Sequence, residues 1–158
     1  MEFLKATYDD VPEIMALYKD VIKNTFTTWD ENYPSEDMIK GDIDDGNFYV
    51  LKDNLKIVAA SFLGKKTDDK ELWQNALSSP MGVARICVSP TQQGKGVGTY
   101  FMKMLIDEAK KRGADGMHFH VCVQNPSAIK MYEKCGFRKF GDIVVQYGFE
   151  FFKYEQVF

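Results

Sequence analysis

"TQQGKGVGTYFM", residues 91–102, places three glycines at alternate positions around the start of a predicted amphipathic helix. One glycine is enough for most turns, so three at this spacing indicate a backbone that comes very close to a ligand. The first N–H groups of a helix are unpaired and lie at the positive end of the helix dipole, which favours phosphate groups. We therefore expect the amides of Gly94, Gly96 and Gly98 to bind a diphosphate, with the ammonium group of Lys95 nearby.

Two other phosphate-binding motifs fit this stretch less well. A dinucleotide-binding loop requires G-x-G-x-x-G early in the chain, whereas the pattern here is G-x-G-x-G and lies deep in the chain. A P-loop requires a hydroxyl residue after its lysine, whereas Lys95 is followed by Gly96. A strand-to-helix turn that binds no ligand is the remaining alternative.

Patterns of apolar residues predict the elements around this stretch. Pro12 near a first turn, Ser35 as an N-cap and Gly113 beyond a last turn mark helix ends. The predicted helices cover 11–24, 35–46, 97–112 and 127–134, with one further turn around 72–77. The predicted strands cover 4–7, 82–88, 117–123, 137–145 and 149–157, and residues 48–64 form a hairpin that turns at Asp53–Asn54. This order predicts one α/β (α+β) domain over residues 1–158, with a central mixed sheet of about seven strands and about four flanking helices.

Composition restricts the classes of function. The 158 residues are 45% hydrophobic and carry a net charge of -3, which suits one globular domain and argues against nucleic acid as the main partner. No apolar stretch is long enough for a membrane span, and the first residues, MEFLKATYDD, lack the pattern of a secretion signal. The three cysteines form no C-x-x-C pair, so we expect reduced thiols, no metal site and a cytoplasmic location.

A second informative stretch, VQNPSAIKMYEKCGF, covers residues 123–137 and follows the next predicted strand. Together with the loop at 93–98 it resembles the GNAT superfamily of N-acetyltransferases, whose members carry a Q/R-x-x-G-x-G/A loop and then an N-x-x-A…Y-E-x-x-G-F segment. The order of predicted elements also agrees with that family over nearly the whole chain. The resemblance implies an acetyl-CoA-dependent N-acetyltransferase acting on a primary amine of a small molecule or peptide, and a sheet whose strands splay apart around the cofactor.

The resemblance also implies which residues bind acetyl-CoA, the co-substrate. Its pantetheine arm carries amides and adds to the strand before the glycine loop like a further strand. The implied residues are Ile86, Cys87 and Val88 for the arm, Gln93, Gly94, Lys95, Gly96, Val97, Gly98 and Thr99 for the diphosphate, and Asn125, Ser127 and Tyr132 beyond the next strand. For Asn125 a role as a helix cap is the alternative.

Tyr132 is the expected general acid. Acetyl transfer from a thioester expels a thiolate, and a phenol placed against that sulfur can deliver a proton as the bond breaks. A tyrosine packed in the core beside Met131 is the alternative interpretation.

The general base is less well defined by the sequence. Many relatives have a glutamate on the strand before the glycine loop, whereas Gly82–Arg85 of this chain contains no carboxylate. His120 is our candidate for the base. The alternatives are His118, Asp30, Glu31 and a water relay that ends at a backbone carbonyl.

The acceptor amine is expected near the segment NTFTTWDENYPS, residues 24–35. Aromatic rings beside carboxylates suit a cationic amine, and the same residues also suit a loop packed on the core. The candidate acceptor-binding residues are Phe26, Trp29, Asp30 and Glu31.

Two hypotheses without acetyl transfer stay open on sequence alone. The first is a non-catalytic CoA-binding sensor or interaction module, which would keep the glycine loop but lack a usable acid or base. The second is a nucleotide-binding regulator. A candidate homodimer edge is predicted in the last strand, where we expect exposed aromatic residues at Phe149, Phe151, Phe152 and Tyr154.

Overall fold

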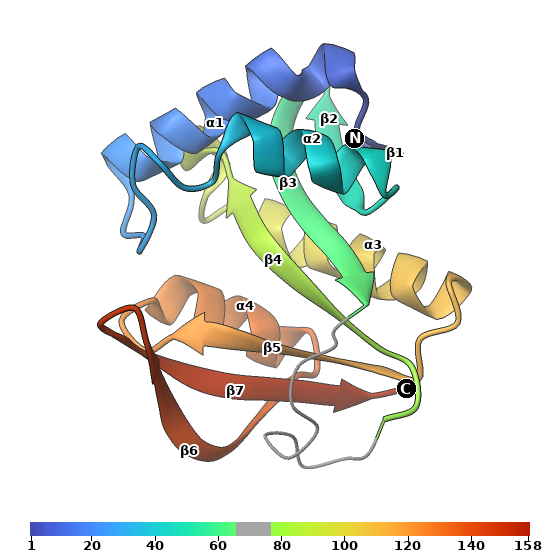
Figure 1. The fold of residues 1–158 in the computed structure, drawn as a ribbon, viewed down its shortest axis with the longest axis vertical. Coiled ribbons are helices and arrows are strands. Elements are labelled where there is room, and N and C mark those ends of the chain that lie inside the picture. Colours follow the sequence, from blue (N-terminus) through green and yellow to red (C-terminus); the bar gives the residue numbers. More distant parts are fainter. Residues whose placement is uncertain (66–76) are drawn as a thin grey trace. The chain divides into compact units, whose positions relative to one another are not determined.

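The computed structural model describes residues 1–65 and 77–158 (Figure 1). Its helices are α1 Val11–Asn24, α2 Glu36–Asp44, α3 Val97–Lys111 and α4 Pro126–Lys134. Its strands are β1 Glu2–Lys5, β2 Phe48–Asp53, β3 Lys56–Lys65, β4 Pro80–Val88, β5 Gly116–Cys122, β6 Arg138–Gln146 and β7 Phe149–Val157. The elements follow the order predicted from the sequence. The helical turn expected around 72–77 lies outside the described residues except for Leu77, which is not helical.

The strands form a seven-stranded mixed sheet in the order β1-β2-β3-β4-β5-β7-β6. β4 and β5 pair in parallel, whereas β1–β2, β2–β3, β5–β7 and β6–β7 pair in an antiparallel arrangement. The predicted fold class, a mixed sheet of seven strands with four helices, is therefore confirmed.

The described residues divide into two compact units, each built from two separate stretches of the chain. The first unit contains residues 1–63 and 84–101, and the second contains the described parts of 64–83 and 102–158. β4 and α3 each begin in one unit and end in the other. The expectation of one domain over residues 1–158 stays a prediction.

The core of the first unit lies under α1 and α2, which lie side by side in Figure 1. Ile14, Leu17, Tyr18 and Val21 recur at helical spacing along α1 and pack with Ile39 of α2. Burying a large apolar side chain contributes about 1.5–3 kcal/mol, so this apolar face determines which side of α1 turns inward. The same core includes Phe48 and Val50 of β2, Ile57 and Ala60 of β3, and Cys87 of β4.

The hairpin between β2 and β3 turns one residue later than predicted. Asn54 and Leu55 have φ values of 48° and 69°, so these two residues form the turn in place of Asp53 and Asn54. Two consecutive positive φ values match the twist of the flanking strands. Because leucine rarely adopts this conformation, no residue type at these two positions together indicated the observed register.

The second unit is built around β5, β7 and β6, with α4 against one face of these strands. Phe119 of β5 contacts the rings of Tyr132 and Phe137, with centroids 4.6 and 4.8 Å away. A Cβ added to Gly116 would lie 2.5 Å from the carbonyl oxygen of Gln156, so only glycine allows this close approach at the start of β5.

The prediction that the last strand forms a sheet edge lined by exposed aromatic residues is wrong in two respects, whereas the homodimer itself stays a prediction. β7 lies between β5 and β6, so β6 is the edge strand at this end of the sheet. Tyr154, expected to be exposed, is only 1% exposed, and its hydroxyl donates a hydrogen bond to Glu133 of α4. Among the described helices, none is both long and apolar enough to cross a membrane.

Candidate active site

The glycine loop between β4 and α3 adopts a conformation that requires glycine at two of its three positions. Gly94 and Gly96 have φ values of 77° and 81°, in the region that residues with a Cβ rarely adopt. No described atom lies within 4 Å of a Cβ built at either position, so packing within the protein does not exclude a side chain there. Gly98 lies in the first turn of α3 instead.

The backbone of this loop presents unpaired donors. The first hydrogen bond that closes α3 runs from the Tyr100 N–H to the Gly96 carbonyl oxygen, at 3.0 Å. Within the described residues, no hydrogen bond is found for the N–H groups of residues 94–98. The first turn of α3 contains no acidic residue, and Lys95 is exposed. These features together suit an anionic ligand.

The side chain of Gln93 fixes the loop to the strand before it. Its amide group donates a hydrogen bond of 3.2 Å to the carbonyl oxygen of Val88, the last residue of β4. The N–H of Ser89 donates to the carbonyl oxygen of Val58 on β3, at 2.8 Å. The start of the loop is therefore held at the end of β4.

β4 pairs with β5 only at its beginning. The register joins Pro80 to Gly116 and Met81 to Met117, although β4 continues to Val88. Among the described residues, the ladder between β4 and β5 ends at Met81. Cys87 is buried in the core of the first unit, and burial raises the pKa of its thiol well above the ordinary value.

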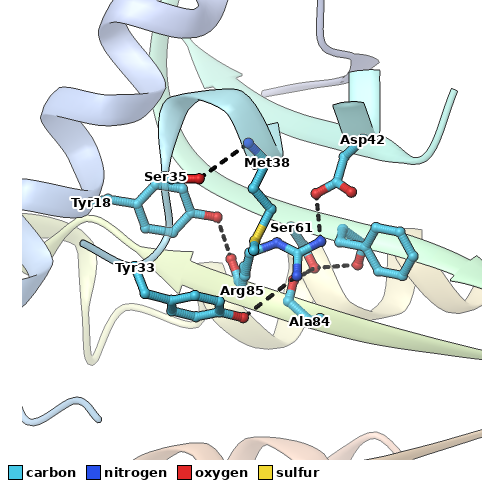
Figure 2. A network of polar contacts seen from close by, with 9 residues as sticks. Tyr18, Tyr33, Ser35, Met38, Asp42, Ser61, Ala84 and Arg85 are labelled. Atoms are coloured by element: carbon cyan, nitrogen blue, oxygen red, sulfur yellow. Dashed lines mark hydrogen bonds and ion pairs between the residues drawn. The ribbon is translucent and has the colours of Figure 1, made fainter. Parts of the chain in front are cut away.

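Arg85 interrupts β4 with a φ of 53° and forms the centre of the polar network in Figure 2. The hydroxyl of Tyr18 on α1 donates a hydrogen bond of 2.5 Å to the carbonyl oxygen of Arg85. Burial raises the pKa of Tyr18 well above its ordinary value, so this phenol stays protonated and remains a donor. This bond helps to hold the backbone of Arg85 in the left-handed conformation, which a residue with a side chain rarely adopts.

The guanidinium group of Arg85 lies among three side chains of the first unit. Its Nη2 donates to the carboxylate of Asp42 on α2 at 2.5 Å, and Nη1 lies 3.5 Å from the hydroxyl oxygen of Tyr33. The ring of Phe62 lies below it, with its centroid 5.1 Å from Cζ. Desolvation raises the pKa of Asp42 despite the opposing charge of Arg85.

Tyr132 lies on α4 and is 4% exposed. Its ring contacts Phe119 and Tyr154, and its hydroxyl forms no hydrogen bond with the described residues. Burial, and secondarily the nearby Cys135, raise the pKa of Tyr132 well above the ordinary value. The phenol is therefore protonated at neutral pH and has a proton that is not engaged elsewhere in the described structure.

Asn125 caps α4, as the alternative interpretation of this residue predicted. Its side-chain oxygen accepts a hydrogen bond of 3.2 Å from the N–H of Ala128. Ser127, in the first turn, is exposed. The side-chain oxygen of Asn125 is thus engaged in the cap, whereas a role of Asn125 and Ser127 in cofactor binding stays a prediction.

The two histidines lie on β5, which pairs with β7. His118 is opposite Glu155 and His120 is opposite Lys153. His118 is buried and His120 is half-buried, with its ring 6.4 Å from that of Phe151. In the two described stretches of the chain, no group of three or more potential ligand side chains could hold a metal ion.

Part of the segment expected to bind the acceptor packs against the core of the first unit. Trp29 packs edge-on against Tyr18 and borders the core, and the Asp30 carboxylate accepts a hydrogen bond from the N–H of Asn32. Phe26 is 47% exposed, and Glu31 is exposed. Trp29 and Asp30 therefore have structural roles, whereas Phe26 and Glu31 face solvent.

The predicted site residues divide between the two units. Residues 86–88, the loop 93–99 and the acceptor candidates 26–31 belong to the first, whereas His120, Asn125, Ser127 and Tyr132 belong to the second. The sequence did not single out Asp42. Arg85 was noted only as the last residue of Gly82–Arg85, a stretch without a carboxylate. A lone arginine in the apolar stretch MGVARICV was the available signal, since a charge in a buried strand needs a partner.

Comparison with known proteins identifies one family. A family model described as "Acetyltransferase (GNAT) family" matches residues 14–137. The [Ribosomal protein bS18]-alanine N-acetyltransferase of Escherichia coli strain K12 is 39% identical over 54 residues, which are 34% of this chain and 36% of that protein. A protein named "Uncharacterized N-acetyltransferase YobR", from Bacillus subtilis strain 168, is 38% identical over 56 residues, which are 35% of this chain and 23% of that protein. The chain thus spans about a quarter to a third of the length of the curated relatives it matches.

Solved structures share the fold over the whole chain. The structure of yncA from Salmonella typhimurium with its cofactor acetyl-CoA has a TM-score of 0.78 and 20% identity, and the match covers 99% of this chain and 93% of that one. At this level of identity the likeness concerns the fold alone.

Proposed function

This chain belongs to the acetyltransferase (GNAT) family, and on that premise we propose that it transfers an acetyl group from acetyl-CoA to a primary amine of a small molecule or peptide. The observation that carries the proposal is the glycine loop at the start of α3. Its N–H groups at residues 94–98 are unpaired within the described residues, and its two left-handed glycines leave open space around them. These N–H groups would bind the diphosphate of acetyl-CoA, and the ammonium group of Lys95 would add a cation.

The backbone of residues 86–88 would bind the pantetheine arm. The end of the ladder between β4 and β5 at Met81 supports this proposal, because an arm with amide groups can bind to a strand edge. When bound, acetyl-CoA supplies the acyl group and a thiolate leaving group. The amine attacks the thioester carbonyl carbon, and the bond between that carbon and the sulfur breaks.

Tyr132 would donate the proton that the departing thiolate takes up. Its raised pKa keeps the hydroxyl protonated, and its hydroxyl has no partner among the described residues. His120 would accept the proton that the attacking ammonium group must lose. Replacing His120 with glutamine is therefore expected to lower kcat, with the affinity for CoA unchanged.

A second candidate function is a CoA-binding module that does not catalyse transfer. The specific observation in its favour is the absence of a carboxylate on Gly82–Arg85, where many relatives carry a glutamate. Location in the cytoplasm, and the absence of nucleic acid, membrane and metal partners, stay predictions from composition.

One experiment separates the two functions. The purified protein is titrated with CoA by calorimetry, and the release of free thiol from acetyl-CoA is then followed with a panel of amines. Thiol release that depends on an amine supports the acetyltransferase. CoA binding without release for any amine supports the module, and the absence of CoA binding contradicts both.

A further inference from the structure

Arg85 is an unusual residue for its position in β4. It lies in the apolar stretch MGVARICV, and its side chain is only 12% exposed. Burying a guanidinium group is costly unless its donors are bonded, so such a residue is expected to have a full set of partners. The partners found here leave part of that capacity unused.

A guanidinium group has five N–H donors. In the described structure, one short bond joins Nη2 to Asp42, and Nη1 has only the long contact of 3.5 Å to the Tyr33 hydroxyl. Nε has no partner among the described residues. Asp42 and the Phe62 ring therefore fix the position of the group, while the donors of Nη1 are poorly satisfied.

The Nη1 side of the guanidinium group borders the surface of the first unit. Tyr33, whose hydroxyl points toward Nη1 in Figure 2, is 37% exposed. A phenol can donate as well as accept, so Nη1 and the Tyr33 hydroxyl together offer two donors to one ligand group. A carboxylate, with two acceptor oxygens, matches such a pair.

Arg85 also has the right place along β4. In the proposed function, the diphosphate binds at residues 94–98 and the pantetheine arm runs back along β4 from Val88 to Ile86. The next residue in that direction is Arg85, so the acyl end of the arm would approach it. Asp42 and Tyr33 belong to the segment from 25 to 44, which includes the expected acceptor residues.

We propose that Arg85 and Tyr33 bind a carboxylate of the acceptor, and that the acceptor is a small amine that also carries a carboxylate, such as an amino acid. The inference rests on the proposed function and adds the substrate class to it. Asp42 neutralises the guanidinium group, so selection depends on directed donors more than on net charge. Arg85 is a specificity-determining residue in this account.

The test uses matched acceptor pairs, each an amino acid and its carboxamide with the same side chain. Rates of thiol release from acetyl-CoA give kcat/KM for both members, corrected to the concentration of free amine. The wild-type protein is expected to prefer the carboxylate by about 10- to 100-fold, the range for a charge-assisted hydrogen bond. Equal values for both members overturn the inference and leave the proposed function intact. No transfer to any acceptor contradicts both.

Two variants break the same ion pair and separate recognition from structure. Arg85→Gln is expected to reduce the preference for the carboxylate by about 10-fold or more, whereas Asp42→Asn retains or increases it, since the guanidinium group then has more free donors and a net charge. An ion pair that is only structural predicts the same change for both variants, and that result overturns the inference.

Tyr33→Phe changes a partly exposed residue and leaves the ion pair between Arg85 and Asp42 in place. It is expected to lower the preference about threefold or more through the loss of one donor. Arg85→Lys keeps the charge without the planar fork and is expected to give an intermediate preference. An unchanged preference in both of these variants also overturns the inference.

Discussion

Replacing Gly96 with alanine separates the conformational role of this glycine from its role in ligand binding. Gly96 has a φ of 81°, and no described atom lies within 4 Å of an added Cβ. The left-handed conformation costs a residue with a Cβ about 1–2 kcal/mol. The smaller conformational entropy of the unfolded alanine chain offsets about 0.4–1 kcal/mol of that cost. Because the position is strained, we expect a net loss of about 1 kcal/mol in the free energy of unfolding.

For a chain of 158 residues, this loss corresponds to a fall in Tm of about 2–4 °C. The effect on CoA is expected to be larger. A methyl group above the loop would keep the diphosphate from one or two N–H groups, each worth about 1.5–3 kcal/mol to a charged acceptor. The affinity for CoA should therefore fall by about 10-fold or more, as measured by titration calorimetry.

Gly113→Ala is the matched control. Gly113 follows α3, has a φ of 87°, and likewise has no described atom within 4 Å of an added Cβ. Both variants should therefore lose similar stability, while only Gly96→Ala loses affinity for CoA. If both variants show the expected fall in Tm but bind CoA with equal affinity, the glycine loop is not the phosphate site.

Three further predictions follow from the described contacts. Tyr132→Phe should lower kcat by about 100-fold, with CoA affinity retained, in the thiol-release assay; a fully active variant would remove Tyr132 from the mechanism. Asp10→Asn should lower the free energy of unfolding by about 1 kcal/mol at pH 7. Burial opposes ionisation of Asp10, but bonds from Lys52 and Thr7 lower its pKa overall, so this contribution is present above about pH 4 and is lost as the pH falls through the lowered pKa. Denaturant unfolding at pH 7 and pH 3 should therefore show a difference between variant and wild type that shrinks in acid, and a constant difference would contradict this reasoning. Asn125→Ala should cost about 1 kcal/mol through loss of the α4 cap, measured as a lower Tm, and no change in Tm would show that the cap is dispensable.

The elements were predictable where local chemistry determines them. The apolar spacing from Val11 to Val21 and the proline at its start predicted α1 with the bounds observed. Ser35 caps α2 through the N–H of Met38, at 3.2 Å, as its residue type indicated. Such signals are local, because each depends on residues within about one turn of the helix.

Features that depend on distant residues were not predictable. Arg85 and Asp42 are 43 positions apart, and no pattern in either segment indicates that they meet. Tyr154 lies in the stretch FEFFKY, where apolar residues occupy successive positions and no alternation identifies the buried face. Its burial follows from the position of β7 between β5 and β6, which only the topology reveals.

The candidate site was predicted in parts. The loop at 94–98 has the unpaired N–H groups and the left-handed glycines that its sequence indicated. The tyrosine of α4 is buried with a raised pKa, which fits both the predicted acid and a tyrosine packed in the core. Trp29, expected to bind the acceptor, packs edge-on against Tyr18, since an aromatic residue in a loop can pack on the core as readily as it can bind a ligand; its role in acceptor binding stays a prediction.

The central claim is that the backbone N–H groups of residues 94–98 bind the phosphates of coenzyme A. A crystal structure of the protein with acetyl-CoA tests it directly. The account predicts diphosphate oxygens within hydrogen-bonding distance of these N–H groups, with the pantetheine arm along residues 86–88. A bound cofactor whose phosphates lie elsewhere, with the glycine loop empty, would contradict the account.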